Sequence, residues 1–206
     1  MEYTTLAVPE RVKSAMEAIA ARGIKVEFVE AKESALSHLL TLIPDGVSVV
    51  TAASVTLQEI GFEEEFNSDR HNWRNLRAEI RTENDPIKRS LLRRQSALAD
   101  YCVGSVSAIA ETGELVVASQ SGSQLSPYLS SDYVILVAGT QKIVPTFDDA
   151  IRRVRDYCVP KVEELGKKTL GRDGAGTVGK LLIFENEATY LKRNVHLIMV
   201  NEVLGF

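Results

Sequence analysis

Apolar residues recur every three to four positions in some stretches of the chain and form short unbroken runs in others. The first pattern predicts helices, which we expect over residues 9–22, 35–43 and 146–159. The second, rich in Val and Ile, predicts strands, which we expect over residues 25–30, 47–51, 103–117, 133–139, 180–185 and 195–200. Runs apolar on both faces are typical of a parallel sheet covered by helices. The chain is therefore expected to be an α/β protein with a central, mostly parallel sheet flanked by helices.

Residues 62–98 interrupt this pattern with a dense mixture of both signs of charge. Asp85 and Pro86 look like the cap and first turn of a helix that carries Ile87 and Leu91. We expect a charged helical excursion that lies over the sheet or across a partner subunit. Its arginines could collect an anion, but acidic residues alternate with them, which favours a solvated surface of ion pairs.

The glycines of residues 174–179 match G-x-G-x-x-G and, with Lys180, nearly match a phosphate loop. Both motifs need a strand before the glycines and a helix after them, so that phosphate meets a helix N-terminus. Here a polar stretch over residues 161–179, expected to be a mobile connection, precedes a strand. The motif is therefore rejected as a nucleotide site.

Composition narrows the class of protein. The 206 residues fit one domain over residues 1–206, and a net charge of -4 gives no general attraction to nucleic acid. Apolar runs are too short to span a membrane, and the first residues do not resemble a signal peptide, so we expect a cytoplasmic protein. Two cysteines cannot hold an iron–sulfur cluster alone, and the three histidines lack metal-ligand spacing. No metal or cluster is therefore expected in this chain.

Candidate binding residues follow the strands. Thr51 and Ser54 stand between a buried strand and a short helix, where Ser54 can cap the helix and hydroxyls can meet an anion. A helix cap without a ligand remains the alternative. Residues 119–124 form a second polar loop around a glycine, and Lys142 follows the strand over residues 133–139. Lys142 could neutralise an anion or simply lie on the surface.

Glu111 is the candidate reactive carboxylate. It follows an apolar run and precedes Thr112 and Gly113, so it could be partly desolvated beside backbone donors. Such a carboxylate could orient a substrate, act as a base or attack an acyl group. The alternative is that Glu111 caps a turn or forms an ion pair.

The segments GSVSAIAETGELV (residues 104–116), ASQSGSQL (118–125) and VAGTQKIVP (137–145) closely resemble the LUD-domain family, that of lactate-utilisation protein C. The likeness extends to residues 150–155, more weakly to residues 51–54, and to the NEVLGF ending. It implies a fold like that of the superfamily of ribose-5-phosphate isomerase, glucosamine-6-phosphate deaminase and coenzyme A transferases. It also implies a link to the oxidation of L-lactate to pyruvate beside iron–sulfur partner proteins.

By position, the resemblance implies one pocket whose members are Thr51, Ser54, Glu111, Thr112, Gly113, Ser121, Gly122, Ser123 and Lys142. The leading hypothesis is a protein that binds a small anionic metabolite, such as a compound related to lactate, within lactate utilisation. One alternative is an enzyme like the isomerases or transferases that uses Glu111. Another is a non-catalytic assembly subunit, and a homo-oligomer is expected. All three readings assume that the Thr51–Ser54, Glu111–Gly113 and Ser121–Ser123 segments line one crevice.

Overall fold

A six-stranded sheet forms the centre of the computed structural model, which describes residues 2–171 and 173–206. All of its neighbouring strands are parallel, as expected from runs of apolar residues buried on both faces. The predicted α/β class with a mostly parallel sheet is therefore confirmed. Across the sheet the strands are β1 (Lys25–Val29), β10 (Asn194–Val200), β7 (Tyr133–Gly139), β4 (Tyr101–Ser105), β2 (Ser48–Thr51) and β3 (Arg74–Asn75).

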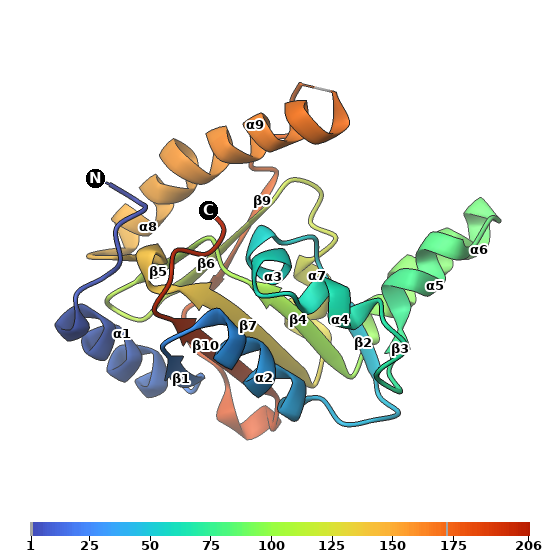
Figure 1. The fold of residues 1–206 in the computed structure, drawn as a ribbon, viewed down its shortest axis with the longest axis horizontal. Coiled ribbons are helices and arrows are strands. Elements are labelled where there is room, and N and C mark those ends of the chain that lie inside the picture. The colour runs from blue at the N-terminus through green and yellow to red at the C-terminus, as the bar shows by residue number, and fades with distance from the viewer. Residues whose placement is uncertain (1, 172) are drawn as a thin grey trace.

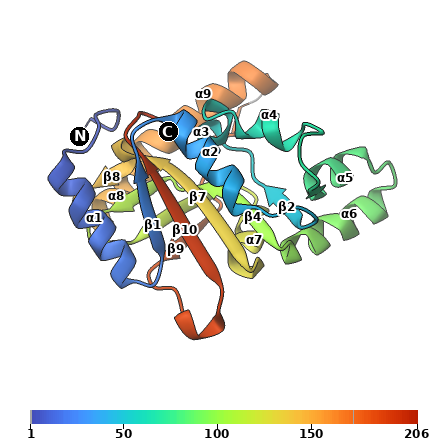
Figure 2. The same ribbon diagram turned by 60° about the horizontal axis from the view of Figure 1, so that its bottom comes forward.

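Helices cover one face of this sheet, and a mixed arrangement covers the other (Figures 1 and 2). On the first face lie α2 (Lys32–Leu42), α3 (Val55–Glu59) and α4 (Phe62–Phe66), whose apolar side chains pack on Ile135 and Val137 of β7. On the opposite face, Leu136 packs with α1 (Pro9–Ala21) and with a second sheet. The alternation of side chains along β7 thus supplies both cores.

The second sheet was not separated from the first in the sequence pattern. It has four strands with mixed directions, and its outer face packs on Ala150 of α8 (Phe147–Arg153) and on Val154, which directly follows this helix. The turn at Gly113 reverses the chain between two of these strands, and its positive φ of 104° suits glycine. In order the strands are β8 (Ile143–Val144), β5 (Ala108–Ala110), β6 (Leu115–Ser119) and β9 (Lys180–Phe184).

The helix expected over residues 146–159 does not end there: of the two outcomes that Pro160 left open, an end or a kink, the first is wrong. A π-helical turn over Val154–Cys158 leads directly into α9 (Val159–Leu170), where Pro160 occupies the first turn. A proline inside a helix cannot donate a hydrogen bond to the preceding turn, and the wider π-helical turn before Pro160 is where the helix departs from regular α geometry. The stretch expected to be a mobile connection is therefore helical as far as Leu170, and α9 ends at Gly171 in a left-handed conformation.

The charged excursion consists of α4, the short strand β3, α5 (Leu76–Thr82), α6 (Pro86–Gln95) and a 3-10 turn at Ser96–Leu98. Asp85 caps α6 as expected, because its Oδ1 accepts hydrogen bonds from the backbone of Ile87 at 2.8 Å and Lys88 at 3.3 Å. α4 packs on the sheet, and Leu76 at the start of α5 joins the core that contains Val50 of β2, whereas the rest of α5 and α6 extend beyond the edge of the sheet (Figure 1). No helix within the described residues is long and apolar enough to cross a bilayer.

Shortening the Leu136 side chain tests the two-core arrangement. Leu136 is fully buried in β7, so Leu136→Ala should lower the free energy of unfolding by about 2–5 kcal/mol, through lost burial and a residual cavity. Leu129 on α7 (Leu125–Ser130) is 57% exposed and provides the matched control, with an expected change within about 0.5 kcal/mol. Urea denaturation followed by circular dichroism measures both. Equal effects of the two substitutions would contradict the packing described here.

Candidate functional site

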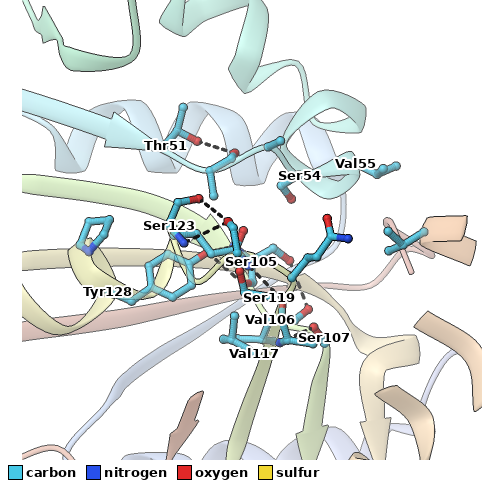
Figure 3. A pocket seen from close by; sticks show the side chains of 18 of the residues that line it. Thr51, Ser54, Val55, Ser105, Val106, Ser107, Val117, Ser119, Ser123 and Tyr128 are labelled. Atoms are coloured by element: carbon cyan, nitrogen blue, oxygen red, sulfur yellow. Dashed lines mark hydrogen bonds between the residues drawn. The ribbon is translucent and has the colours of Figure 1, made fainter. Parts of the chain in front are cut away.

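A cavity of about 970 Å³ opens at the carboxyl ends of β2 and β4 (Figure 3). These parallel neighbours end at Thr51 and Ser105, and both residues line the cavity. Residues of the excursion, of α9 and of the second sheet complete its walls. In α/β proteins, ligands bind outside the carboxyl ends of the parallel strands. The position alone makes this cavity the candidate functional site.

Hydroxyl and amide side chains dominate the polar lining of the cavity. They come from β2, β4, β6 and the loops that follow them, and also from α3, α6, α7 and the segment before β9, so segments distant in the sequence meet around one space (Figure 3). These groups can donate or accept hydrogen bonds, which suits a ligand rich in oxygen atoms. The residues are Thr51, Ser54, Thr56, Gln58, Ser90, Ser96, Ser105, Ser107, Ser119, Gln120, Ser121, Ser123, Gln124, Ser126, Tyr128 and Thr177.

Lys142 is the buried cation of this site. It follows β7 and is only 1% exposed, although it lines the cavity. Its Nζ donates hydrogen bonds to Thr56 Oγ1 at 2.9 Å, Ser105 Oγ at 3.1 Å and the carbonyl of Val106 at 3.0 Å. The ammonium thereby connects α3, the end of β4 and the second sheet. Of the two alternatives that the sequence left open for Lys142, a place on the surface is therefore wrong.

Burial lowers the pKa of the Lys142 ammonium to about 7. Repulsion from the Arg153 guanidinium acts in the same direction, whereas Cys158 and Glu59 partly oppose it. Lys142 therefore changes its protonation state near neutral pH, whereas an exposed lysine with an ordinary pKa stays protonated there.

The charged side chains that line the cavity all carry positive charge. Arg77 of α5 and Arg93 and Arg94 of α6 join Lys142, and no Asp or Glu of the described residues is among the lining residues. Arg77 also forms an ion pair with Glu63 at 3.1 Å. The excursion is thus a surface of ion pairs in part, but it also presents arginines to the cavity. A chain with a net charge of -4 therefore has a locally cationic cavity.

Arg153, a second buried cation, fixes the wall of the cavity at Ser107. Its Nη1 donates a hydrogen bond to the Ser107 carbonyl, and its guanidinium lies 5.1 Å from the ring centre of Tyr157. Arg153 Nη1 also lies 3.2 Å from the sulfur of Cys158, which lines the cavity. Burial raises the pKa of the Cys158 thiol. Cys158 is therefore an uncharged part of the wall and not an activated nucleophile.

Tyr128 forms the wall beside β4 because Gly104 leaves room for its ring. A Cβ at position 104 would lie 1.8 Å from the phenol oxygen, so only glycine fits there. The phenol accepts a hydrogen bond from the Ser105 backbone at 3.1 Å and is 3.2 Å from the Ser105 carbonyl. These contacts hold the last residue of β4 in place.

The Glu111–Gly113 segment lies outside the cavity, which corrects the expectation that three segments line one crevice. Glu111 Oε2 pairs with Arg11 of α1 at 3.1 Å, and the Thr112 carbonyl accepts from Arg22 at 3.0 Å. A Cβ on Gly113 would meet Arg22 and the α1 backbone. These residues form the β5–β6 turn, which leads away from the carboxyl ends of the central strands. In this structure the segment docks the second sheet on α1.

The other predicted site residues do come together. Thr51, Ser54, Ser121, Ser123 and Lys142 all line the cavity. Ser54 also caps α3, since its Oγ accepts from the Leu57 backbone at 3.4 Å. Gly122 does not line the cavity itself, but its positive φ of 85° turns the loop that presents its two neighbours.

The glycine-rich segment over residues 174–179 binds a carboxylate of the protein itself. Gly174 and Gly176 donate backbone hydrogen bonds to the Glu163 carboxylate of α9 at 3.0 and 2.7 Å, and these bonds lower the pKa of that carboxyl. The segment precedes β9 and not a helix, so the rejection of a nucleotide motif agrees with the structure.

Sequence reasoning missed several lining residues. Ser105 and Ser107 stand two positions apart at the end of a strand, and this spacing could have marked them as candidates. Thr56 and Tyr128 carry no local signal, because their roles depend on contacts with Lys142 and Gly104. Arg93 and Arg94 were among the arginines that could collect an anion, but the acidic residues that alternate with these arginines favoured a surface of ion pairs.

Two comparisons with known proteins give matches. The family model of the LUD domain matches residues 12–170. A crystal structure of a DUF162 family protein from Deinococcus radiodurans aligns with a TM-score of 0.56 and 14% sequence identity, over 95% of this chain and 99% of that one. At this identity the likeness concerns the fold alone. None of the curated proteins matches the chain.

Removing the Tyr128 hydroxyl tests its role at the cavity wall. Tyr128→Phe leaves the buried Ser105 N–H without its partner, so the free energy of unfolding should fall by about 1–3 kcal/mol. Tyr190→Phe is the matched control, because Tyr190 is 82% exposed, and it should change stability by less than about 0.5 kcal/mol. Chemical denaturation compares the two. Unchanged stability in Tyr128→Phe would show that this hydroxyl does not hold β4.

Proposed function

The chain belongs to the LUD-domain family, and from that premise we propose that it binds a small anionic metabolite in the cavity at the carboxyl ends of β2 and β4. The observation that carries the proposal is the charge of the cavity: Lys142, Arg77, Arg93 and Arg94 line it without an acidic side chain among the described lining residues. A carboxylate or phosphate would be attracted to this field.

Lactate, pyruvate and related acids are the first ligands to consider, because the family is linked by name to lactate utilisation. The cavity of about 970 Å³ exceeds what a three-carbon acid fills, which favours a larger anion such as a sugar phosphate. The hydroxyls of Ser54, Ser119 and Ser123 are suited to hold further oxygen atoms of such a ligand. If the protein acts in lactate oxidation, the electrons would have to pass to an acceptor outside this chain's two cysteines, and we propose an iron–sulfur partner protein for this role.

We keep an enzymatic role as a second candidate, because the pKa of Lys142 is lowered to about 7. A lysine with this pKa could transfer a proton to or from a bound carbonyl or hydroxyl compound. Glu111 does not enter this candidate, because it pairs with Arg11 outside the cavity. The test is an exchange experiment in deuterated water. NMR would follow whether the hydrogen on the carbon beside a ligand carbonyl is replaced by deuterium. Unchanged spectra in the presence of a bound ligand would speak against turnover of this kind.

β10 lies beyond the matched residues 12–170, yet it pairs with β1 and β7 in the central sheet. This pairing supports the proposal that residues 1–206 form a single domain. Homo-oligomerisation and a cytoplasmic location stay predictions.

Calorimetric titration with L-lactate, pyruvate and a sugar phosphate tests the binding proposal. At least one anion should bind saturably, and Lys142→Met should weaken it by tenfold or more, since an ion-paired contact contributes at least about 1.4 kcal/mol. Arg93→Ala, on the exposed α6, should weaken binding without disturbing the core. Glu111→Gln is the matched control and should bind like the unaltered protein. Flat titrations with all three anions would overturn the proposal.

The affinity should also depend on pH in a defined direction. Lys142 is protonated below pH 7 and loses its proton above it, so affinity for an anion should fall as pH rises from 6 to 9. The fall should approach tenfold per pH unit while the free protein loses the proton and the complex keeps it. Lactate or pyruvate suits this experiment, because neither titrates in this range. A pH-independent affinity would exclude Lys142 from the binding site, and Lys142→Met should lack the dependence.

A further inference from the structure

Two histidines and a carboxylate from three separate elements meet beneath α2. Glu27 lies on β1, His38 on α2 and His196 on β10, and α2 contacts both of these strands. One ligand atom from each residue, the Glu27 Oε2 and the two histidine nitrogens, lies within 4.8 Å of the others. Nothing in the sequence spacing announced this group, because the residues are brought together by the parallel pairing of β1 with β10.

The three atoms surround a small common space. His196 Nε2 lies 3.3 Å from Glu27 Oε2, and His38 Nε2 approaches the same carboxylate oxygen. Ligand atoms at the corners of a tetrahedral zinc site, with bonds of about 2.0 Å, are separated by about 3.3 Å. The spacing of His196 and Glu27 already matches this value. A small shift of His38 would complete three corners.

His196 supplies the independent sign that a ligand is missing from this space. Its side chain is only 9% exposed, and its Nε2 is a buried atom with no hydrogen-bond partner among the described residues. A buried imidazole nitrogen normally makes a well-directed hydrogen bond, and this one makes none although Glu27 Oε2 lies 3.3 Å away. The nitrogen points toward Glu27 and His38, where a metal ion would satisfy it.

We propose that Glu27, His38 and His196 bind a divalent transition-metal ion of the zinc type, with a fourth position left for water. Histidine nitrogen and carboxylate oxygen are donors that zinc accepts readily, and three protein ligands are typical of sites that keep a water. Glu27 and His38 are each about one-third exposed, so the ion can enter from solvent. None of the three residues lines the cavity, and the site is independent of the proposed function.

The ion would tie α2 to the edge of the central sheet. β1 is the edge strand and has only β10 as a neighbour, so a bond from Glu27 and His196 to His38 adds a cross-link between this edge and its covering helix. Lys25 lies 2.8 Å from the other oxygen of Glu27, Oε1, and leaves Oε2 free. The Lys25 ammonium orients the carboxylate but also repels a cation, and its 61% exposure weakens that repulsion.

Titration of metal-free protein with Zn²⁺ by calorimetry, and with Co²⁺ by visible absorption, tests the proposal. One ion should bind per chain, Co²⁺ should give the absorption bands of a low-coordinate site, and saturating Zn²⁺ should raise the midpoint of thermal unfolding. His38→Ala and Glu27→Gln should each weaken binding by more than about 100-fold, since loss of even an outer-shell partner costs 10–100-fold.

His71→Ala is the matched control, because His71 pairs with Glu65 and stacks on Trp73 away from this site, and it should bind the metal normally. His38 is partly exposed, so its variant is expected to fold even if a His196 variant does not. Lys25→Ala should bind equally or several-fold more tightly. No saturable binding, or equal binding by His38→Ala and the unaltered protein, would overturn the proposal and leave a hydrogen-bonded His–Glu–His cluster only.

Discussion

The buried ammonium of Lys142 is the contact on which the arrangement of the candidate site depends. Removing an ammonium from water is costly unless oxygen atoms replace the water. Here Thr56, Ser105 and Val106 provide them, and they come from α3, from the end of β4 and from the chain that enters the second sheet. The same three contacts therefore satisfy the charge and set the relative positions of the elements around the cavity.

Polar and charged residues have two different roles in this structure: some hold elements of the fold together, and others line the cavity. Charges on the Glu111–Glu114 turn are used to dock the second sheet on α1, through Arg11 and Arg22. The Gly174–Gly176 loop is used to bind the Glu163 carboxylate. What remains without an acidic partner among the lining residues is the cationic group of Lys142, Arg93 and Arg94. The proposed anion site is thus the place where the protein leaves positively charged side chains without an acidic partner among the lining residues.

Much of the fold could be predicted from the sequence, because the spacing of apolar residues within each segment indicates whether it forms a helix or a strand. The runs around Val49 and Ile135 became parallel strands buried on both faces, and Asp85 capped α6 as expected. The continuation of the helix through Pro160 could not be predicted, because the π-helical turn before it leaves no clear mark in the sequence. The second sheet was also missed, since its short strands look like continuations of the first.

The positions of Thr51 and Ser54 at the cavity could be predicted, because both residues come at or just after the carboxyl end of a buried parallel strand. Glu111 was misplaced because a carboxylate after an apolar run looks the same whether its turn meets a ligand or a helix. Only the three-dimensional pairing with Arg11 separates these cases. Likewise, His196 is distant in sequence from Glu27 and His38, and the three meet through the pairing of β1 with β10 and the packing of α2 on these strands.

A crystal structure of the protein with its tightest-binding carboxylate or phosphate compound tests the central claim most directly. The account predicts the anionic group inside the cavity, within hydrogen-bond distance of Lys142 Nζ or of a hydroxyl that contacts it, with Glu111 still paired to Arg11. An anion bound at the Glu111–Gly113 turn, with the Lys142 cavity empty, would contradict it.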